Sequence, residues 1–343
     1  MSIITQQQKK NKCENLKEYV RRVYSRIFSP LKTGEINYER NIICGKCKNW
    51  SLIGESCPNC GYKPLSKREV AQNTNFLYKN FYRAQSDTYE IKEVDSRLAY
   101  VSDIGQIHHE NQDSGFVSLL NNWKFLGVAD GVSRSNSPKI ASQYALEKSF
   151  EYLNTISLDS SNIVEEIKNA IFYAHAQIQA IKLDYIDPDV DPPEATIVIA
   201  LVQDNKAYIG WVGDSRAYTI DSKSTQVLTR DDSWVMYAVD KGMSFKEANN
   251  SPMAHAITQC MGMNDVSLVP HVIEVDITGK DLLLCSDGLW NYFDDEQLLH
   301  ELYRKISGTA KDIANKLVKA ANIKGGNDNI TVAIYKSDCY CTS

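Results

Sequence analysis

Short apolar runs rich in β-branched residues recur from Leu98 onward, and polar residues or glycines bound each of them. Runs of this kind are typical of β-strands. They predict strands at 98–102, 114–119, 124–129, 195–203, 206–212, 215–221, 269–276, 281–285 and 329–335. Longer stretches with apolar residues at three- and four-residue steps predict helices at 138–154, 161–183, 294–304 and 309–321.

The connections between the strands at 195–203, 206–212 and 215–221 are too short to hold a crossover helix. We therefore expect these three strands to form an antiparallel meander. Helices that are segregated from such strands indicate an α+β layered sandwich. Residues 222–265 are rich in Asp, Ser, Met and Asn and predict an excursion over one edge of the sandwich, of the kind called a flap.

The first forty residues differ from the rest of the chain. Residues 1–12 are polar, and residues 14–28 place apolar side chains at helical steps with basic side chains between them. We interpret residues 1–40 as a basic tail followed by an amphipathic helix. Such a helix can bind anionic lipid or nucleic acid, although a solvated basic face over a docked apolar stripe is the more common use.

Two Cys-x-x-Cys pairs follow, Cys44 with Cys47 and Cys57 with Cys60. Each pair presents two thiolates to one side of a tetrahedral zinc ion, and two pairs complete a structural site. A segment with so little apolar content needs such a crosslink to fold. The sequence predicts a zinc ribbon at 41–65 that holds one Zn²⁺. A redox function would need only one of the pairs.

Charge divides the chain at a similar place. Residues 1–92 contain 17 Lys and Arg against 8 Asp and Glu, whereas the remaining residues contain 21 against 35. We expect separate modules: a linker at 66–94, a catalytic domain at 95–337 and a tail at 338–343. The linker mixes aromatic and basic residues, which permits stacking on nucleic acid, but packing on the next domain is the favoured use.

The scattered cysteines and the polar start bear on location. The nine cysteines form no ladder of the secreted disulfide type, and thiolates held by metal suit a reducing cytosol. The first ten residues contain no apolar core like that of a signal peptide, and no apolar run is long enough to span a bilayer. We expect a cytoplasmic protein without a transmembrane segment.

Acidic residues end several of the apolar strands. Asp130-Gly131 and Asp287-Gly288 each follow a core strand, and Asp214 follows the strand at 206–212. A single Asp-Gly pair is an ordinary turn. An ionised carboxylate at a buried strand end is costly unless a cation or hydrogen bonds compensate it, so several of them indicate sites for hard metal ions.

Collected in chain order, these residues lie in five motifs: Asp103 to Asp113, Asp130-Gly131, Trp211 to Tyr218, Ser286 to Trp290 and Gly326 to Val332. With these motifs the chain resembles the metal-dependent type-2C (PPM) family of serine/threonine protein phosphatases, in its bacterial form, over roughly residues 95–336. The resemblance implies a four-layer α-β-β-α sandwich, in which two antiparallel sheets are flanked by helices.

The resemblance also implies two Mn²⁺ or Mg²⁺ ions, with a third possible. Asp130 matches the carboxylate that bridges the two metals, and Gly131 matches the residue that lends its carbonyl. Asp287 and Asp328 match the other ligands of the first metal. Asp113 matches the acidic residue on the side of the second metal, and Asp214 matches the position that holds a weaker third metal together with Asp287.

Several positions depart from the family pattern. His108 stands where the family usually has an arginine that binds the substrate phosphate, and histidine cannot form the same bidentate fork. His109 or Arg134 could substitute for that arginine, and His108 and Arg134 are the candidate phosphate-binding residues. Val132 follows the Asp-Gly pair, as in bacterial members. The segment Leu228 to Ser233 resembles a family segment that has histidine at the position of Asp232.

The main prediction is a phosphatase that hydrolyses phosphoserine and phosphothreonine in proteins by means of a metal-bridged water, with a cognate Ser/Thr kinase as its counterpart. The zinc module would serve in targeting or docking. One alternative is a pseudophosphatase that binds phosphoproteins without turnover, which the missing arginine favours and the complete set of aspartates disfavours. Another is a phosphatase that its zinc module recruits to nucleic acid.

Overall fold

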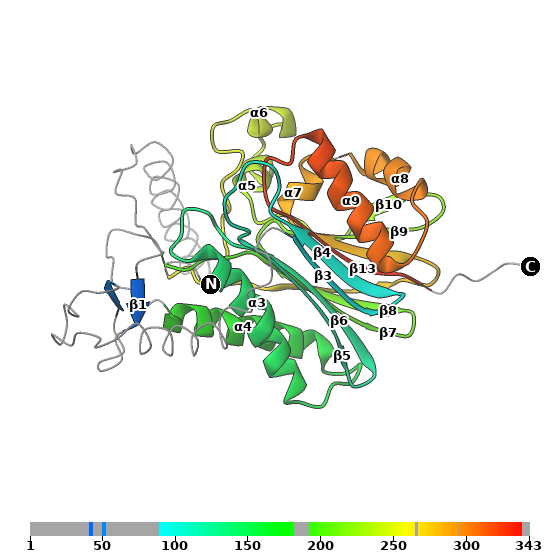
Figure 1. Cartoon of the computed structure of the whole chain (residues 1–343), viewed down its shortest axis with the longest axis horizontal. Coiled ribbons are helices and arrows are strands. Elements are labelled where there is room, and N and C mark those ends of the chain that lie inside the picture. The colour runs from blue at the N-terminus through cyan, green and yellow to red at the C-terminus, as the bar shows by residue number, and fades with distance from the viewer. Residues whose placement is uncertain are drawn as a thin grey trace, which may run out of the picture. The chain divides into compact units, whose positions relative to one another are not determined.

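A computed structural model describes residues 41–43, 50–52, 89–181, 192–264, 267–293 and 295–337 (Figure 1). A small sheet of two antiparallel strands, β1 (Asn41–Ile43) and β2 (Trp50–Leu52), pairs Asn41 with Leu52. It belongs to a different compact unit from the larger sheets. The predicted zinc ligands Cys44, Cys47, Cys57 and Cys60, and the predicted amphipathic helix, lie outside the described residues.

The main unit contains two sheets in which every neighbouring pair of strands is antiparallel. The six-stranded sheet has the order β10 (Thr225–Val227), β9 (Arg216–Ile220), β12 (Asp281–Cys285), β13 (Ile330–Tyr335), β4 (Leu98–Asp103), β3 (Tyr89–Asp95). The five-stranded sheet has the order β11 (His271–Asp276), β8 (Lys206–Val212), β7 (Ile197–Gln203), β6 (Trp123–Asp130), β5 (Asp113–Leu120).

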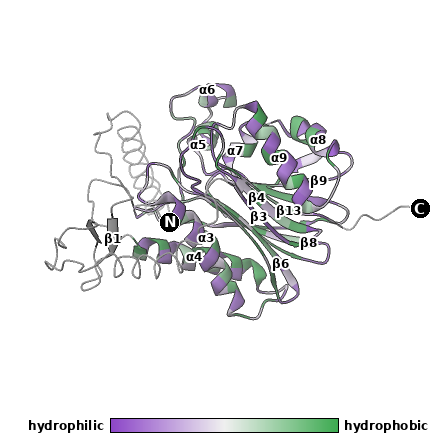
Figure 2. Ribbon diagram, viewed as in Figure 1, coloured by the Kyte–Doolittle hydropathy of each residue, from purple (hydrophilic) through white to green (hydrophobic). Residues whose placement is uncertain are grey.

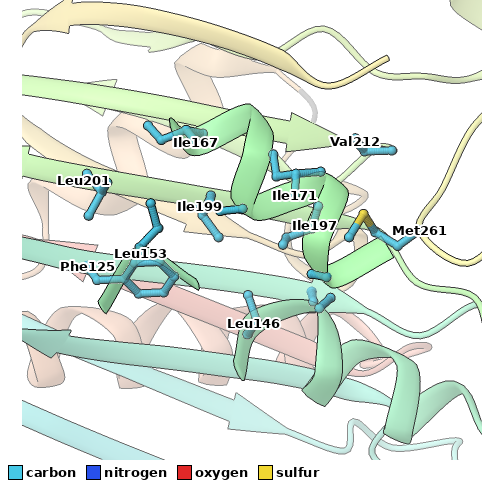
Figure 3. Close-up of a cluster of buried hydrophobic side chains, with 14 of the residues drawn as sticks. Phe125, Leu146, Leu153, Ile167, Ile171, Ile197, Ile199, Leu201, Val212 and Met261 are labelled. Carbon is cyan, nitrogen blue, oxygen red and sulfur yellow. The ribbon is translucent and has the colours of Figure 1, made fainter. Parts of the chain in front are cut away.

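Strand β7 shows how the layers are held together, because both of its faces are buried. Ile197, Ile199 and Leu201 pack with the apolar faces of the long helices α3 (Pro138–Asn154) and α4 (Ile163–Ile181). Figure 3 shows these three side chains beside Ile167 and Ile171 of α4. The other residues of β7, Val198, Ala200 and Val202, pack instead between the two sheets. Because successive side chains of a strand point to opposite faces, β7 contributes to two separate hydrophobic cores.

The outer face of the six-stranded sheet is covered by α7 (Asp287–Trp290), α8 (Glu296–Arg304) and α9 (Ala310–Lys324), as Figure 1 shows. Leu283 of β12 and Val332 of β13 share a buried cluster with Ile313 and Leu317 of α9. Hydrophobic and hydrophilic residues alternate around α4 and α9 (Figure 2), as expected of helices with one buried face. Two antiparallel sheets flanked by helices confirm the α+β fold class.

The predicted meander is wrong at its third strand. Strands β7 and β8 do pair as a hairpin, with Gln203 opposite Lys206. Strand β9, however, pairs with β12 and β10 in the other sheet. The chain changes sheets at Gly213, whose φ of 102° is a conformation that an L-residue with a side chain rarely adopts. A short connection therefore marks a crossing between layers here rather than a hairpin.

The other predicted strands and helices are present. The helix at 138–154 and the strand at 281–285 have the predicted ends, and the rest have shifted ends. The structure also adds elements that the pattern did not indicate. Strand β3 starts at Tyr89 within the segment interpreted as a linker, and its residues are mostly exposed, which removes the apolar signal. Two short helices, α5 (Trp234–Asp240) and α6 (Phe245–Asn249), lie in the region predicted as a flap. None of the helices in the described ranges combines the length and apolar character needed to cross a bilayer.

Candidate active site

Asp113 and Asp130 face each other where two strands of the five-stranded sheet meet the loops. Asp113 begins β5, Asp130 ends β6, and the register pairs them directly. Directly opposite residues of an antiparallel pair project to the same face. The side chain of each acts on the ionisation of the other, so the fold places two carboxyls side by side at one edge.

Asp287 and Asp328 come from the other sheet. Asp287 begins α7 just after β12, and Asp328 precedes β13, the neighbour of β12. The backbones of the two segments touch: a Cβ on Gly288 would lie 1.9 Å from the carbonyl oxygen of Asn329. Only glycine permits this approach, so Gly288 brings the start of α7 against the Asp328 loop.

Gly131 extends the Asp130 strand end into a tight turn. Its N–H donates to the carbonyl of Gln112 at 3.2 Å, and a Cβ at this position would lie 2.3 Å from the carbonyl oxygen of Pro138. A side chain here would push the turn away from the start of α3. The predicted role of Gly131, which uses only its backbone, agrees with the lack of space for a side chain.

The Asp214 turn is tied to Asp130 through Thr196. The N–H of Asp130 donates to Thr196 Oγ1 at 3.1 Å, and the N–H of Thr196 donates to the carbonyl of Asp130 at 2.8 Å. The same Thr196 Oγ1 lies 2.8 Å from Ser215 Oγ. The turn that carries the chain between the two sheets is thus attached to the strand end that carries Asp130.

The carboxyls share a strongly acidic neighbourhood. Burial raises the pKa of Asp113 to about 7, although hydrogen bonds from Ser286 and Thr331 oppose the rise. Burial, reinforced by the charges of Asp328 and Asp113, likewise raises the pKa of Asp287 to about 7. Burial and neighbouring carboxylates also raise the pKa values of Asp130 and Asp214 well above their usual range. Positive charge in the site would lower these pKa values and favour the ionised carboxylates at neutral pH.

Two buried carboxylate oxygens without hydrogen-bond partners indicate whether divalent cations fit the site. Oδ1 of Asp113 and Oδ1 of Asp287 are both buried and accept no hydrogen bond. Carboxylate oxygens without partners are the ligands that Mg²⁺ and Mn²⁺ take, and a cation would also offset the mutual repulsion. Among the described residues, no three His, Cys, Asp or Glu side chains lie close enough together to coordinate one metal ion as they stand. Because like charges repel, a cation is what would draw these oxygens together. The donor set fits.

The predicted phosphate-binding residues lie at the loops around these carboxyls. His108 Nε2 lies 3.2 Å from Asp328 Oδ1, so this histidine contacts a predicted metal ligand. Arg134 is exposed on the turn after Gly131. Between them, Ser133 Oγ donates to Gln112 Oε1 at 2.8 Å, which links the Val132–Arg134 turn to the loop before Asp113.

The sequence interpretation missed the residues that hold the carboxyls in place. Ser286 Oγ donates to Asp113 Oδ2 at 2.6 Å and accepts from the N–H of Thr331 at 3.0 Å, so it joins the two sheets. Asn329 Oδ1 accepts from the N–H of Gln112 at 2.7 Å, and its Nδ2 donates to the carbonyl of Ile104 at 2.8 Å. Ser286 and Asn329 each adjoin a predicted ligand in sequence, which is the one signal that could have indicated them.

Arg216 contributes to the same region without facing the carboxyls directly. Its guanidinium donates to both oxygens of Asp231, at 2.9 and 2.7 Å, and lies 3.7 Å from the ring centre of Trp290. The indole N–H of Trp290 donates to the carbonyl of Asp214 at 2.9 Å. This arrangement supports the Asp214 turn from the side of the six-stranded sheet.

The comparisons with known proteins agree with this site. A sequence model of the protein phosphatase 2C family matches residues 108–320, which is more than half of the chain. The chain belongs to the protein phosphatase 2C family. It is therefore an enzyme of the protein phosphatase class.

Individual relatives agree with this assignment. The serine/threonine phosphatase stp of Listeria monocytogenes serotype 4b is 29% identical over 245 residues, which cover 69% of this chain and 94% of the relative. The crystal structure of serine/threonine phosphatase Stp1 from Staphylococcus aureus superposes with a TM-score of 0.64 at 25% identity, over 73% of this chain and 96% of that one.

A second similar structure was solved with metal. It is the catalytic domain of the serine threonine protein phosphatase PstP in complex with 2 manganese ions, with a TM-score of 0.57 at 25% identity, over 72% of this chain and 98% of that one. The family thus accommodates manganese in this fold.

Proposed function

We propose that this chain hydrolyses phosphoserine and phosphothreonine in proteins, with Mn²⁺ or Mg²⁺ held by the carboxyls at the edges of its two sheets. The observation that carries the proposal is the set of Asp113, Asp130 and Asp287, whose pKa values are raised first by burial and then by the charges of neighbouring carboxylates, Asp328 among them. An enclosed set of like charges has no structural benefit by itself. It is the arrangement expected of a polyvalent cation site.

The proposed ligands are those that the resemblance to the family implies, and the closeness of their carboxyls supports them. Asp130, between the two sheets' carboxyls, would contact both metals, and Gly131 would offer its carbonyl. Asp287 and Asp328 would complete the first site and Asp113 the second, while Asp214 would hold a weaker third ion together with Asp287. When bound, divalent cations supply a nucleophilic water at neutral pH and offset the charge of the phosphoryl oxygens.

The chain's own residues would orient the substrate. His108 and Arg134 are the proposed contacts of the phosphate oxygens, from loops on either side of Gln112. His108 differs from an arginine in one respect that matters here: it lies against Asp328, and its single free ring nitrogen can give one hydrogen bond rather than a fork. We expect productive binding with a weaker hold on the phosphate.

The proposal is tested by phosphate release from a phosphothreonine peptide with Mn²⁺ present. Wild-type protein should turn over, and Asp130→Asn should fall to background. Asp276→Asn makes the same charge change on exposed β11 and should retain wild-type activity. If wild type releases no more phosphate than Asp130→Asn while it still binds the peptide, the chain is a pseudophosphatase and the proposal is wrong.

The N-terminal module is proposed to be a zinc ribbon that holds one Zn²⁺ through Cys44, Cys47, Cys57 and Cys60 and docks the enzyme to a target. The antiparallel pairing of β1 with β2 supports this, because the sequence of Cys44 and Cys47 falls between two paired strands. Metal analysis should find one zinc per chain in wild type and none in Cys44→Ser. A zinc-free wild type would contradict the proposal.

The cellular setting is proposed on the same basis. Cys285 is buried and carries a free thiol, which fits the reducing cytoplasm inferred from the sequence. A Ser/Thr kinase would supply the phosphorylated protein substrates.

A further inference from the structure

Position 232 departs from the family pattern, and the structure shows what surrounds it. Asp232 Oδ1 lies 2.9 Å from Nε2 of His271, the first residue of β11. The imidazole of His271 stacks on the indole of Trp211 in the neighbouring strand β8, with ring centres 4.9 Å apart and planes 24° apart. An imidazole therefore does reach this segment, and it comes from another strand.

Asp232 in turn holds the backbone of Gly213. Its Oδ2 accepts from the N–H of Gly213 at 2.9 Å, and its own N–H donates to the carbonyl of Gly213 at 2.9 Å. Two hydrogen bonds to one glycine fix both of its peptide groups. The glycine has the strained φ of 102°, and the next residue is Asp214. The conformation at Gly213 thus sets the direction in which the Asp214 carboxyl projects.

Gly213 also lies against the strand end that carries the central carboxyl. A Cβ on Gly213 would lie 2.7 Å from Cβ of Thr196, and Thr196 exchanges hydrogen bonds with the backbone of Asp130. The line of contacts from His271 through Asp232 and Gly213 therefore ends in the proposed metal site. Within the described residues, neither His271 nor Asp232 hydrogen-bonds to the side chain of a proposed ligand.

We propose that Asp232 and His271 form a positioning pair that fixes the Asp214 turn and thereby sets the affinity of the third, weaker metal position. This inference rests on the proposed metal role of Asp214. The pair does not contact the Asp214 side chain. Asp232 fixes the backbone of Gly213, and that backbone determines the direction in which the Asp214 side chain projects. We expect the two stronger metal positions, built from Asp113, Asp130, Asp287 and Asp328, to keep their affinity without the pair, because the pairing of β5 with β6 and the contacts of α7 fix their carboxyls.

Through this pair, the affinity of the third metal position would depend on pH. The hydrogen bond with Asp232 raises the pKa of His271 above its ordinary 6.5, while partial burial and Arg230 oppose the rise. Asp232 and Arg230 are the charged groups that act on this imidazole among the described residues. Because the folded pKa is raised, the ion pair is complete below 6.5 and is lost as pH rises through the folded pKa.

Calorimetric titration with Mn²⁺ alone, on the full chain, tests the pair. His271→Ala removes the donor and should weaken the third site about tenfold, the lower end of the range seen for residues that orient metal ligands, with the tighter sites unchanged. His271→Gln keeps an N–H donor for Asp232 and should stay near wild type. His300→Gln, a histidine exchange on α8, is the matched control.

A spectroscopic readout separates positioning from a merely structural effect. Protonation of His271 should quench the stacked Trp211, so wild-type tryptophan emission should titrate with a midpoint above 6.5. His271→Gln should lose this titration, and Trp211→Phe should identify its source. His300→Gln should keep it.

The outcomes are distinguishable. If wild type binds tight Mn²⁺ ions but His271→Ala has an unchanged third site, or if no third site exists, the inference is wrong and the proposed function stands. If wild type binds no Mn²⁺, the proposed function fails, and the inference fails with it.

Discussion

The buried carboxyls and the loops above them are built in opposite ways. The floor of the site, Asp113, Asp130 and Asp287, starts or ends regular elements and is fixed by the register of two sheets. The rim, His108, Ser133 and Arg134, lies in loops, and Ser133 and Arg134 are exposed. Under the proposed function, the geometry of the metal site would be set by the sheet register, whereas phosphate binding would depend on loops that can change without disturbing the sheets.

The largest effect is expected from a substitution of Asp130, the central carboxyl of the floor. Asp130→Asn keeps the shape of the side chain and removes the charge shared by both metals. We expect kcat to fall by about a thousandfold or more, since a metal centre contributes several kcal/mol to the transition state and each 1.36 kcal/mol is tenfold. Steady-state kinetics with saturating Mn²⁺ measure it. Activity within tenfold of wild type would contradict the role of the floor.

The next effect concerns the support of the floor. Ser286→Ala removes the hydroxyl that donates to Asp113 and accepts from Thr331 across the sheets. We expect Mn²⁺ affinity to fall roughly 10- to 100-fold, as for other residues that orient ligands, with little change in KM once metal is saturating. Ser118→Ala, at the other end of β5, should bind Mn²⁺ like wild type. Equal affinities in the two variants would show that Ser286 does not support the site.

A smaller effect is expected at the rim. His108→Ala should raise KM for a phosphopeptide and the inhibition constant of inorganic phosphate together, each about tenfold, because one hydrogen bond to a charged group is lost. His255→Ala, at an exposed histidine within residues 222–265, is the control. If the two constants do not move while kcat falls, His108 acts through Asp328 and not on the phosphate.

The smallest effect is expected at Arg134. The residue is exposed, so solvent and salt screen its charge and limit its contribution to roughly 1 kcal/mol, or about fivefold in KM. Arg134→Ala should show this change at low salt and lose it at high salt. Lys168→Ala, which removes a cation from the outer helix α4, should change KM at neither salt concentration. A salt-independent loss would place Arg134 in direct, desolvated contact with phosphate.

The same division explains what the sequence could predict. The strands that end at Asp130 or just before Asp287 are apolar along most of their length. The sequence therefore predicted both the strands and the acidic residues at their ends. The crossing at Gly213 could not, because nothing in a short loop says which sheet the next strand joins. Strand β3 is exposed and carries no periodic apolar signal.

Contacts between distant segments were equally hidden from the sequence. Ser286, which lies between β12 and α7, meets Asp113 of the other sheet, and His271 meets Asp232 from 39 residues away. Each is an ordinary polar residue in its own segment, and only the fold gives it a partner. The loops of the rim add a further difficulty, because no regular register fixes where their side chains lie.

The central claim is that the buried carboxyls bind divalent metal, and counting bound Mn²⁺ tests it most directly. Calorimetric titration of the zinc-loaded full chain should show two tight Mn²⁺ ions in wild type, and loss of both tight sites in Asp130→Asn while Asp276→Asn retains them. Wild-type protein that takes up no Mn²⁺, or Asp130→Asn that binds it as wild type does, would contradict the claim.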